Sequence, residues 1–186
     1  LSHPRRRPPG PYLVAALGAV LLCVVPGFNV LNYFGSLAAS LPLCVLVGVA
    51  VSRQAQGWGV HPGFRARRAL TMSLQLAALP AVALTLNALR IPNCDLLEGL
   101  GFYLMGAGTS AVLMGQLAAA ASLFGGGALR CALGSLGLMF GWLAWDAYHL
   151  YAHPPVYAFN PFLGYFSGAI YDDLIRLDHR YVVYRL

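Results

Sequence analysis

Residues 33–52 read YFGSLAASLPLCVLVGVAVS, a stretch of 20 residues without a charged side chain. A transmembrane α-helix needs about 20 consecutive, mostly apolar residues to cross a hydrocarbon core of ~30 Å. Only a helix satisfies its own backbone hydrogen bonds in lipid over such a length. The stretch therefore predicts a membrane-spanning helix.

Further apolar stretches of similar character cover residues 11–27, 69–89, 96–124 and 131–151. Together they predict an all-α integral membrane protein, a bundle of about five transmembrane helices over residues 11–151. Residues 1–10 form a basic N-terminus, and residues 152–186 form an irregular, aromatic-rich tail. We expect the first span to be retained, because the small-x-small cleavage site of a signal peptide does not follow it.

The composition agrees with a lipid environment. Hydrophobic residues make up 59% of the chain and charged residues 10%, against about 25% charged residues in soluble domains. The basic side chains are all arginines, and most flank apolar segments, so anionic lipid headgroups rather than nucleic acid are the expected partner. The arginine-only, alanine- and leucine-rich usage is typical of a GC-rich bacterial genome, which makes the bacterial inner membrane the expected location.

The arginines also predict an orientation. They lie before the first span, between the second and third, and between the fourth and fifth: Arg5, Arg6, Arg7, Arg53, Arg65, Arg67, Arg68 and Arg130. The opposite connections carry only Arg90, beside Asp95 and Glu98. Because cytoplasmic loops are enriched in arginine, the N-terminus is expected in the cytoplasm and the C-terminus outside it.

Small residues at four-residue spacing predict close helix packing. Gly137 and Gly141 share one face of the last span, and Gly106 and Ser110 share one face of the fourth. Such pairs let two helix backbones approach closely. We expect these residues to pack inside the bundle. Homodimerisation and a hinge are the alternatives.

The polar residues best placed for chemistry are Asp146, His149 and His153, whose spacing puts them on one helical face. A carboxylate and imidazoles suit a divalent transition metal. The alternatives are interfacial residues exposed to water and a hydrogen-bonded pair without metal; we expect Asp146 to contact His149 or another polar group. Further metal ligands would come from Asp95, Glu98, Asp172 and Asp173.

Motifs typical of enzymes are absent from the sequence. It contains no G-x-S-x-G, H-E-x-x-H or C-x-x-C pattern, and no cofactor is indicated apart from the metal considered above. Asp95 and Glu98 are spaced as a capping box for the fourth span. Cys23 and Cys94 are the one pair that could form a disulfide in an oxidising periplasm, although burial of Cys23 as a small apolar residue is favoured. An enzymatic role is therefore not favoured.

The tail suggests the function. Residues 157–168 combine aromatic residues with glycine and proline, which predicts an irregular segment on the membrane surface, or one that lines a ligand groove. Residues 181–184, with sequence YVVY, predict a short strand. We expect a membrane anchor or scaffold that presents this segment to another envelope subunit, to a second copy or to a downstream domain of a larger protein. A transporter or permease subunit and a metalloenzyme using Asp146 and His149 are the alternatives.

Overall fold

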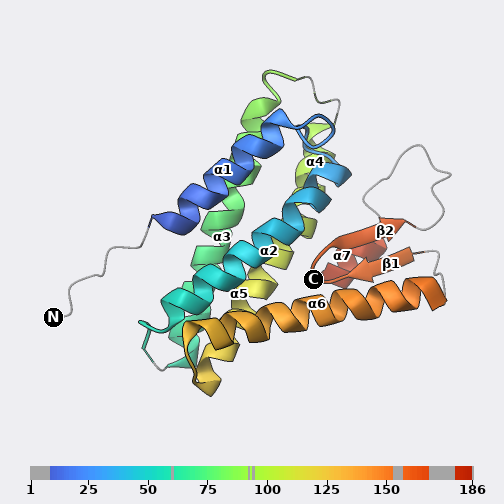
Figure 1. Cartoon of the computed structure of the whole chain (residues 1–186). Helices are drawn as coiled ribbons and strands as arrows, with labels where there is room; N and C mark the ends of the chain where they lie inside the picture. The colour runs from blue at the N-terminus through green and yellow to red at the C-terminus, as the bar shows by residue number, and fades with distance from the viewer. Residues whose placement is uncertain are drawn as a thin grey trace.

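The computed structural model describes residues 9–59, 61–91, 93, 95–152, 157–167 and 179–185. Helices dominate this part of the chain, as predicted (Figure 1). The elements are, in order, α1 (Gly10–Val24), α2 (Tyr33–Ala55), α3 (Pro62–Asn87), α4 (Leu96–Tyr103), the π-helical segment η1 (Leu104–Gly108), α5 (Thr109–Ala121), the 3-10 turn η2 (Ser122–Phe124), α6 (Ala128–Ala152), β1 (Tyr157–Asn160), β2 (Gly164–Ser167) and α7 (His179–Arg185).

Four helices are long and apolar enough to cross a membrane: α2, α3, the continuous α4–η1–α5–η2 element and α6. They are consistent with a multi-pass membrane protein. The first predicted span is shorter than expected, because α1 has 15 residues and a length of only ~22 Å at 1.5 Å per residue. It ends at Val24 because Val25 precedes Pro26 and takes the extended conformation that proline favours.

Helix α3 begins earlier than the predicted boundary at residue 69. Pro62 stands at its first position, where proline fits without losing a hydrogen bond. The arginines expected in a loop therefore lie on the first two turns of the helix. Among them Arg65 is buried, and its guanidinium donates hydrogen bonds to the carbonyl oxygens of Gly59 and Ser122, both at 2.8 Å. It ties the start of α3 to the end of the fourth predicted span.

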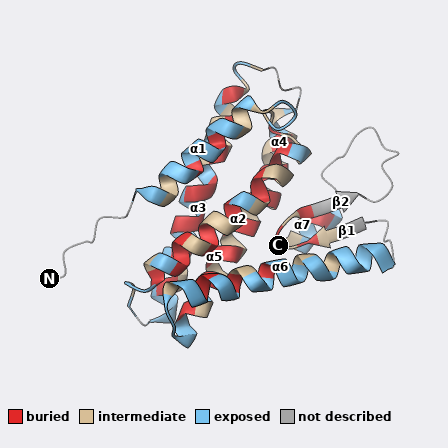
Figure 2. Ribbon diagram, viewed as in Figure 1, coloured by how far each residue is buried: buried red, intermediate tan, exposed pale blue. Residues whose placement is uncertain are grey.

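The centre of the bundle is formed by α2, α3 and α5, where most of the buried residues lie (Figure 2). Small residues let α2 and α5 approach: a Cβ atom added to Gly48 would lie 2.5 Å from Cε of Met114. Polar side chains link helices, as Tyr103 does by donating from Oη to the carbonyl oxygen of Ala77 at 2.8 Å. Helix α1 packs on the outside, mainly against α3.

Helix α6 diverges from this bundle. Its first half packs on α2 and α5 through Cys131, Ala132, Ser135 and Met139, whereas its second half has no buried residue (Figure 2). The diverging half leaves a wedge-shaped region beside α5. The β1–β2 hairpin and α7 occupy it (Figure 1).

The hairpin follows from the chemistry of its turn. Strands β1 and β2 pair antiparallel, with Tyr157 opposite Ser167 and Asn160 opposite Gly164. Between them, Pro161 follows an asparagine, a pairing typical of turns. Gly164 closes the turn with a φ of 108°, a conformation that costs glycine little. The tail is therefore more regular here than predicted.

The predicted strand at residues 181–184 is wrong. These residues belong to α7, which runs from His179 to Arg185. The helical spacing puts Tyr181, Tyr184 and Arg185 close together on one side of α7, against the hairpin. Tyr181 is only 2% exposed, so its burial outweighs the strand preference of the YVVY sequence.

The hairpin also lies deeper than predicted. Its turn residue Phe162 is 3% exposed and packs with Cys44, Met114 and Met139. Cys44 and Met139 are near the midpoints of α2 and α6. The described part of the tail is therefore inserted against the middle of the helices, and does not lie over their outer ends.

Candidate functional site

The hairpin meets the bundle through a polar junction made by Ser110, Asp146, Asn160 and Arg185, of which Ser110 and Asn160 are buried and the two charged residues are half-buried. Asn160 ends β1 and is 2% exposed. Its Nδ2 donates to Oδ2 of Asp146 at 2.5 Å. Its Oδ1 accepts from the backbone N–H groups of Phe162 and Leu163, both at 2.8 Å. One amide side chain thus shapes the turn and holds it to α6.

Arg185, in the last turn of α7, holds the same turn from the other side. One guanidinium nitrogen, Nη1, donates to the carbonyl oxygen of Pro161 at 2.6 Å. Nη2 lies 3.2 Å from the carbonyl oxygen of Asn160 and 3.3 Å from Oγ of Ser110. Among the described residues, its Nε is buried and has no hydrogen-bond partner. The carbonyl groups of the turn therefore solvate a cation close to the apolar bundle.

Ser110 is the residue of α5 that contacts the hairpin turn. It is fully buried on α5, near the middle of the 29-residue Leu96–Phe124 element. Its Oγ also donates to the carbonyl oxygen of Pro161 at 3.1 Å. Irregular backbone at membrane depth is stable only where protein or water satisfies its polar groups. Here Ser110 and Arg185 satisfy them.

Aromatic rings cover the junction. The ring of Phe159 stacks on Tyr181, with 6.3 Å between centroids, and on Tyr184, with 5.1 Å. Burial raises the pKa of both tyrosines above that of a free tyrosine, and the neighbouring Arg185 partly opposes the shift. Both phenols therefore stay neutral at physiological pH.

Little space remains beside this junction. The adjoining cavity, lined among others by Ser36, Gly106, Leu163 and Tyr181, has a volume of about 10 Å³. A cavity needs roughly 10–15 Å³ to hold a single water molecule. In the part of the chain that the structure describes, the junction stabilises the chain's own backbone, and the cavity beside it is about the size of one water molecule.

Asp146 has the polar contact that the sequence predicts, but with Asn160, which sequence reasoning did not consider. His149 is exposed, and its ring lies edge-on to Trp145 with 4.6 Å between centroids. His153 lies outside the described residues, as do Asp172 and Asp173. Within the described ranges, no three histidine, cysteine or acidic residues gather as a metal site.

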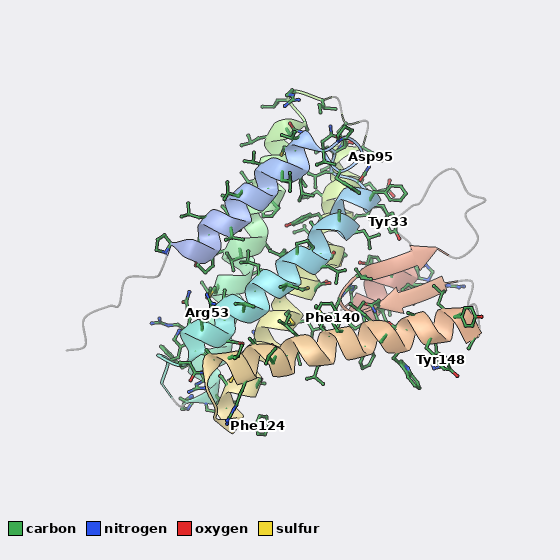
Figure 3. The ribbon with its side chains drawn as sticks, in the orientation of Figure 1. Tyr33, Arg53, Asp95, Phe124, Phe140 and Tyr148 are labelled. Atoms are coloured by element: carbon green, nitrogen blue, oxygen red, sulfur yellow. The ribbon has the colours of Figure 1, made fainter. Side chains whose placement is uncertain are left out.

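The other proposed ligands belong elsewhere. Asp95 caps α4, with Oδ1 accepting from the N–H of Glu98 at 3.2 Å, which is one half of the predicted capping box; the N–H of Asp95 donates to Oδ1 of Asn93 at 3.3 Å. Figure 3 shows Asp95 well apart from Tyr148, the neighbour of His149 on α6. A metal shared between Asp146 and the acidic residues of α4 is therefore not supported. The Cys23–Cys94 pairing also lies outside the described residues, because Cys94 does.

The small residues separate into two groups. Gly106 lies against α2, where an added Cβ would be 2.6 Å from Oγ of Ser36, and Ser110 is fully buried. Among the described residues, nothing lies within 4 Å of a Cβ added to Gly137 or Gly141, so this face points outward there. The face of α6 that is buried against the bundle is that of Ser135 and Met139. A role of Gly137 and Gly141 in helix packing or homodimerisation stays a prediction.

Sequence reasoning missed Asn160 and Arg185. The available signal was the Asn160–Pro161 turn followed by Gly164, in a segment whose aromatic residues could cover it. Nothing in the local sequence distinguishes Arg185 from the neighbouring Arg180. Comparison with protein-family models, curated proteins and solved structures finds no match to this chain.

Proposed function

We propose that the protein is a polytopic membrane scaffold, whose helical bundle holds the C-terminal hairpin and α7 in a fixed position for a partner protein or a downstream domain. The observation that carries this proposal is the use of the polar residues. Asn160, Arg185 and Ser110 bond to backbone groups of the hairpin turn, and Asp146 bonds to Asn160. Because these side chains bond to the turn and to one another, they hold the hairpin in a fixed position.

The arrangement of the helices supports the proposed orientation. The end of α2, the start of α3 and the start of α6 lie at the same end of the bundle (Figure 1). These ends carry Arg53, Arg65 and Arg130, whereas Arg90 lies beyond the far end of α3. In the proposed inner-membrane protein the arginine-rich end faces the cytoplasm. In this orientation α1 is a fifth, shorter membrane-embedded helix. Helix α7 then lies farther from the cytoplasm than the arginine-rich end of the bundle does.

A photo-crosslinking experiment tests the scaffold. A photoreactive residue replaces Val183, which is 73% exposed on α7. We expect a crosslink to one defined envelope protein, or to a second copy, in intact cells. Arg185→Ala should abolish this crosslink because the cation no longer holds α7 against the turn. Arg90→Ala, which removes an exposed arginine remote from the hairpin, should leave it intact.

The scaffold proposal fails if position 183 crosslinks only to lipid. It also fails if Arg185→Ala and Arg90→Ala give the same crosslinks as the unchanged protein while both remain in the membrane fraction. The metalloenzyme alternative has its own test, which is metal analysis of the purified protein with and without Asp146→Ala. Loss of a bound stoichiometric metal in this variant would favour that alternative.

One observation favours the transporter alternative. Arg185 is a cation beside the middle of a predicted span, and η1 interrupts the α-helical hydrogen bonding one turn before Ser110. Such features often mark functional sites in membrane helices. The small adjoining cavity argues against a substrate in this state, so the scaffold remains the better-supported function.

A further inference from the structure

A larger cavity lies at the arginine-rich end of the bundle, away from the hairpin. It has a volume of about 250 Å³ and is bounded by α1, the end of α2, the turn after it and the first turns of α3. Its lining includes Gln54, Trp58, Phe64, Arg67, Arg68 and Thr71. Cationic, aromatic and amide groups therefore surround one space.

The hydrogen-bond donors of this cavity are incompletely used. Nε2 of Gln54 is buried and has no partner among the described residues. Leaving such a donor unpaired is unfavourable, and a rotation of the amide toward the cavity would let a ligand acceptor relieve it. Arg67 and Arg68 are both exposed. The guanidinium of Arg68 lies 4.8 Å from the centroid of the Phe64 ring, which orients it at the rim.

We propose that this cavity binds the phosphate headgroup of an anionic phospholipid. Guanidinium groups bind phosphate oxygens through paired, charge-assisted hydrogen bonds, and the Gln54 amide supplies a further donor. The proposal rests on the membrane placement proposed above, in which this end of the bundle faces anionic headgroups. Trp58 then lies at the depth where tryptophan is enriched in membrane proteins.

The surface beside the cavity favours a lipid over a free phosphate ion. Arg67, Thr71 and Leu74 follow each other at helical spacing on one face of α3. Leu74 is 52% exposed. The face therefore changes from cationic to apolar in the direction of the bilayer centre, as a headgroup followed by an acyl chain requires.

Native mass spectrometry of the purified protein tests the proposal, with phosphatidylglycerol, phosphatidylcholine and inorganic phosphate as separate probes. We expect phosphatidylglycerol to be retained and phosphatidylcholine to be lost. Arg67→Gln should weaken phosphatidylglycerol binding about fivefold, the equivalent of ~1 kcal/mol per arginine. Gln54→Leu should weaken it as well, without changing the charge.

Arg53→Gln is the matched control, because Arg53 is exposed at the same end but does not line the cavity. Equal weakening by Arg53→Gln and Arg67→Gln would overturn the proposal, since it would show a general attraction to the cationic face. Displacement of phosphatidylglycerol by inorganic phosphate at equal concentration would overturn the lipid assignment. Sedimentation of each variant with membranes is measured in parallel, because loss of membrane association would count against the proposed function itself.

Discussion

Asn160→Ala should release the hairpin from the bundle. The substitution removes the acceptor of the Phe162 and Leu163 N–H groups and the donor to Asp146. An unsatisfied buried polar group costs ~1–3 kcal/mol. The N–H of Phe162 is buried and that of Leu163 half-buried, so we expect the docked state to lose about 2–4 kcal/mol.

Cys44 provides the assay. It is fully buried and packs in the same cluster as Phe162, so a membrane-permeant maleimide reaches it only when this cluster opens. A loss of 2–4 kcal/mol corresponds to a roughly 30- to 700-fold increase in the open population. The Cys44 labelling rate, followed by mass spectrometry to separate it from the other cysteines, should rise accordingly. Val183→Ala, on the exposed face of α7, is the control and should leave the rate unchanged.

Exchanging the amide of Asn160 and the carboxylate of Asp146 tests the contact between these two residues. Asn160→Asp keeps an acceptor for the turn but places a carboxylate against Asp146, so Cys44 labelling should again accelerate. Adding Asp146→Asn restores one donor and one acceptor with their positions exchanged, and should slow the labelling. An unchanged rate in Asn160→Ala, or no recovery in the double variant, would refute the reasoning.

Two further predictions concern packing and topology. Gly106→Leu should lower thermal stability in detergent, because its Cβ would lie 2.6 Å from Oγ of Ser36. Gly137→Leu should leave monomer stability unchanged and lower only the dimer fraction. Equal effects of the two substitutions would contradict the assigned interfaces. An enzyme reporter fused after Arg68 should be active only in the cytoplasm, and one fused after Leu186 only outside. Cytoplasmic activity of both fusions would contradict the proposed orientation.

The apolar helices could be predicted from the sequence because composition and length alone identify them. Their ends were less predictable. Val25 was placed inside the first span, although the proline that follows it favours an extended conformation. Helix α3 starts at Pro62, where the arginines suggested a loop; a charged helical turn and a charged loop have the same composition.

The direction in which a helical face points could not be predicted. Gly137 and Gly141 share one face by spacing alone, but whether that face meets another helix depends on how α6 is tilted. In the structure the hairpin and α7 lie between the second half of α6 and the rest of the bundle. Contacts with α2 and α5, which are distant in sequence, hold the hairpin there, and no local pattern encodes them.

The candidate site was predictable in part. A polar contact of Asp146 could be predicted because a carboxylate in an apolar helix needs a polar partner. The partner could not be identified, because Asn160 reaches Asp146 only after the chain reverses beyond the end of α6. The strand predicted for residues 181–184 failed for a related reason: helical spacing is what brings Tyr181 and Arg185 to the hairpin together.

The most direct test asks whether the hairpin turn lies at the middle of the helices in a native membrane. Phe162→Cys is combined with serine at positions 23, 94 and 131, which leaves Cys44 as the only natural cysteine, and disulfide formation is induced in membranes with a membrane-permeant oxidant. We predict an intramolecular crosslink between position 162 and Cys44, because both belong to one buried cluster. Leu129→Cys, exposed at the arginine-rich end of α6, should not crosslink to Cys44. Absence of the crosslink from position 162, with both thiols found free after denaturation, would place the tail away from the bundle and contradict the insertion of the hairpin.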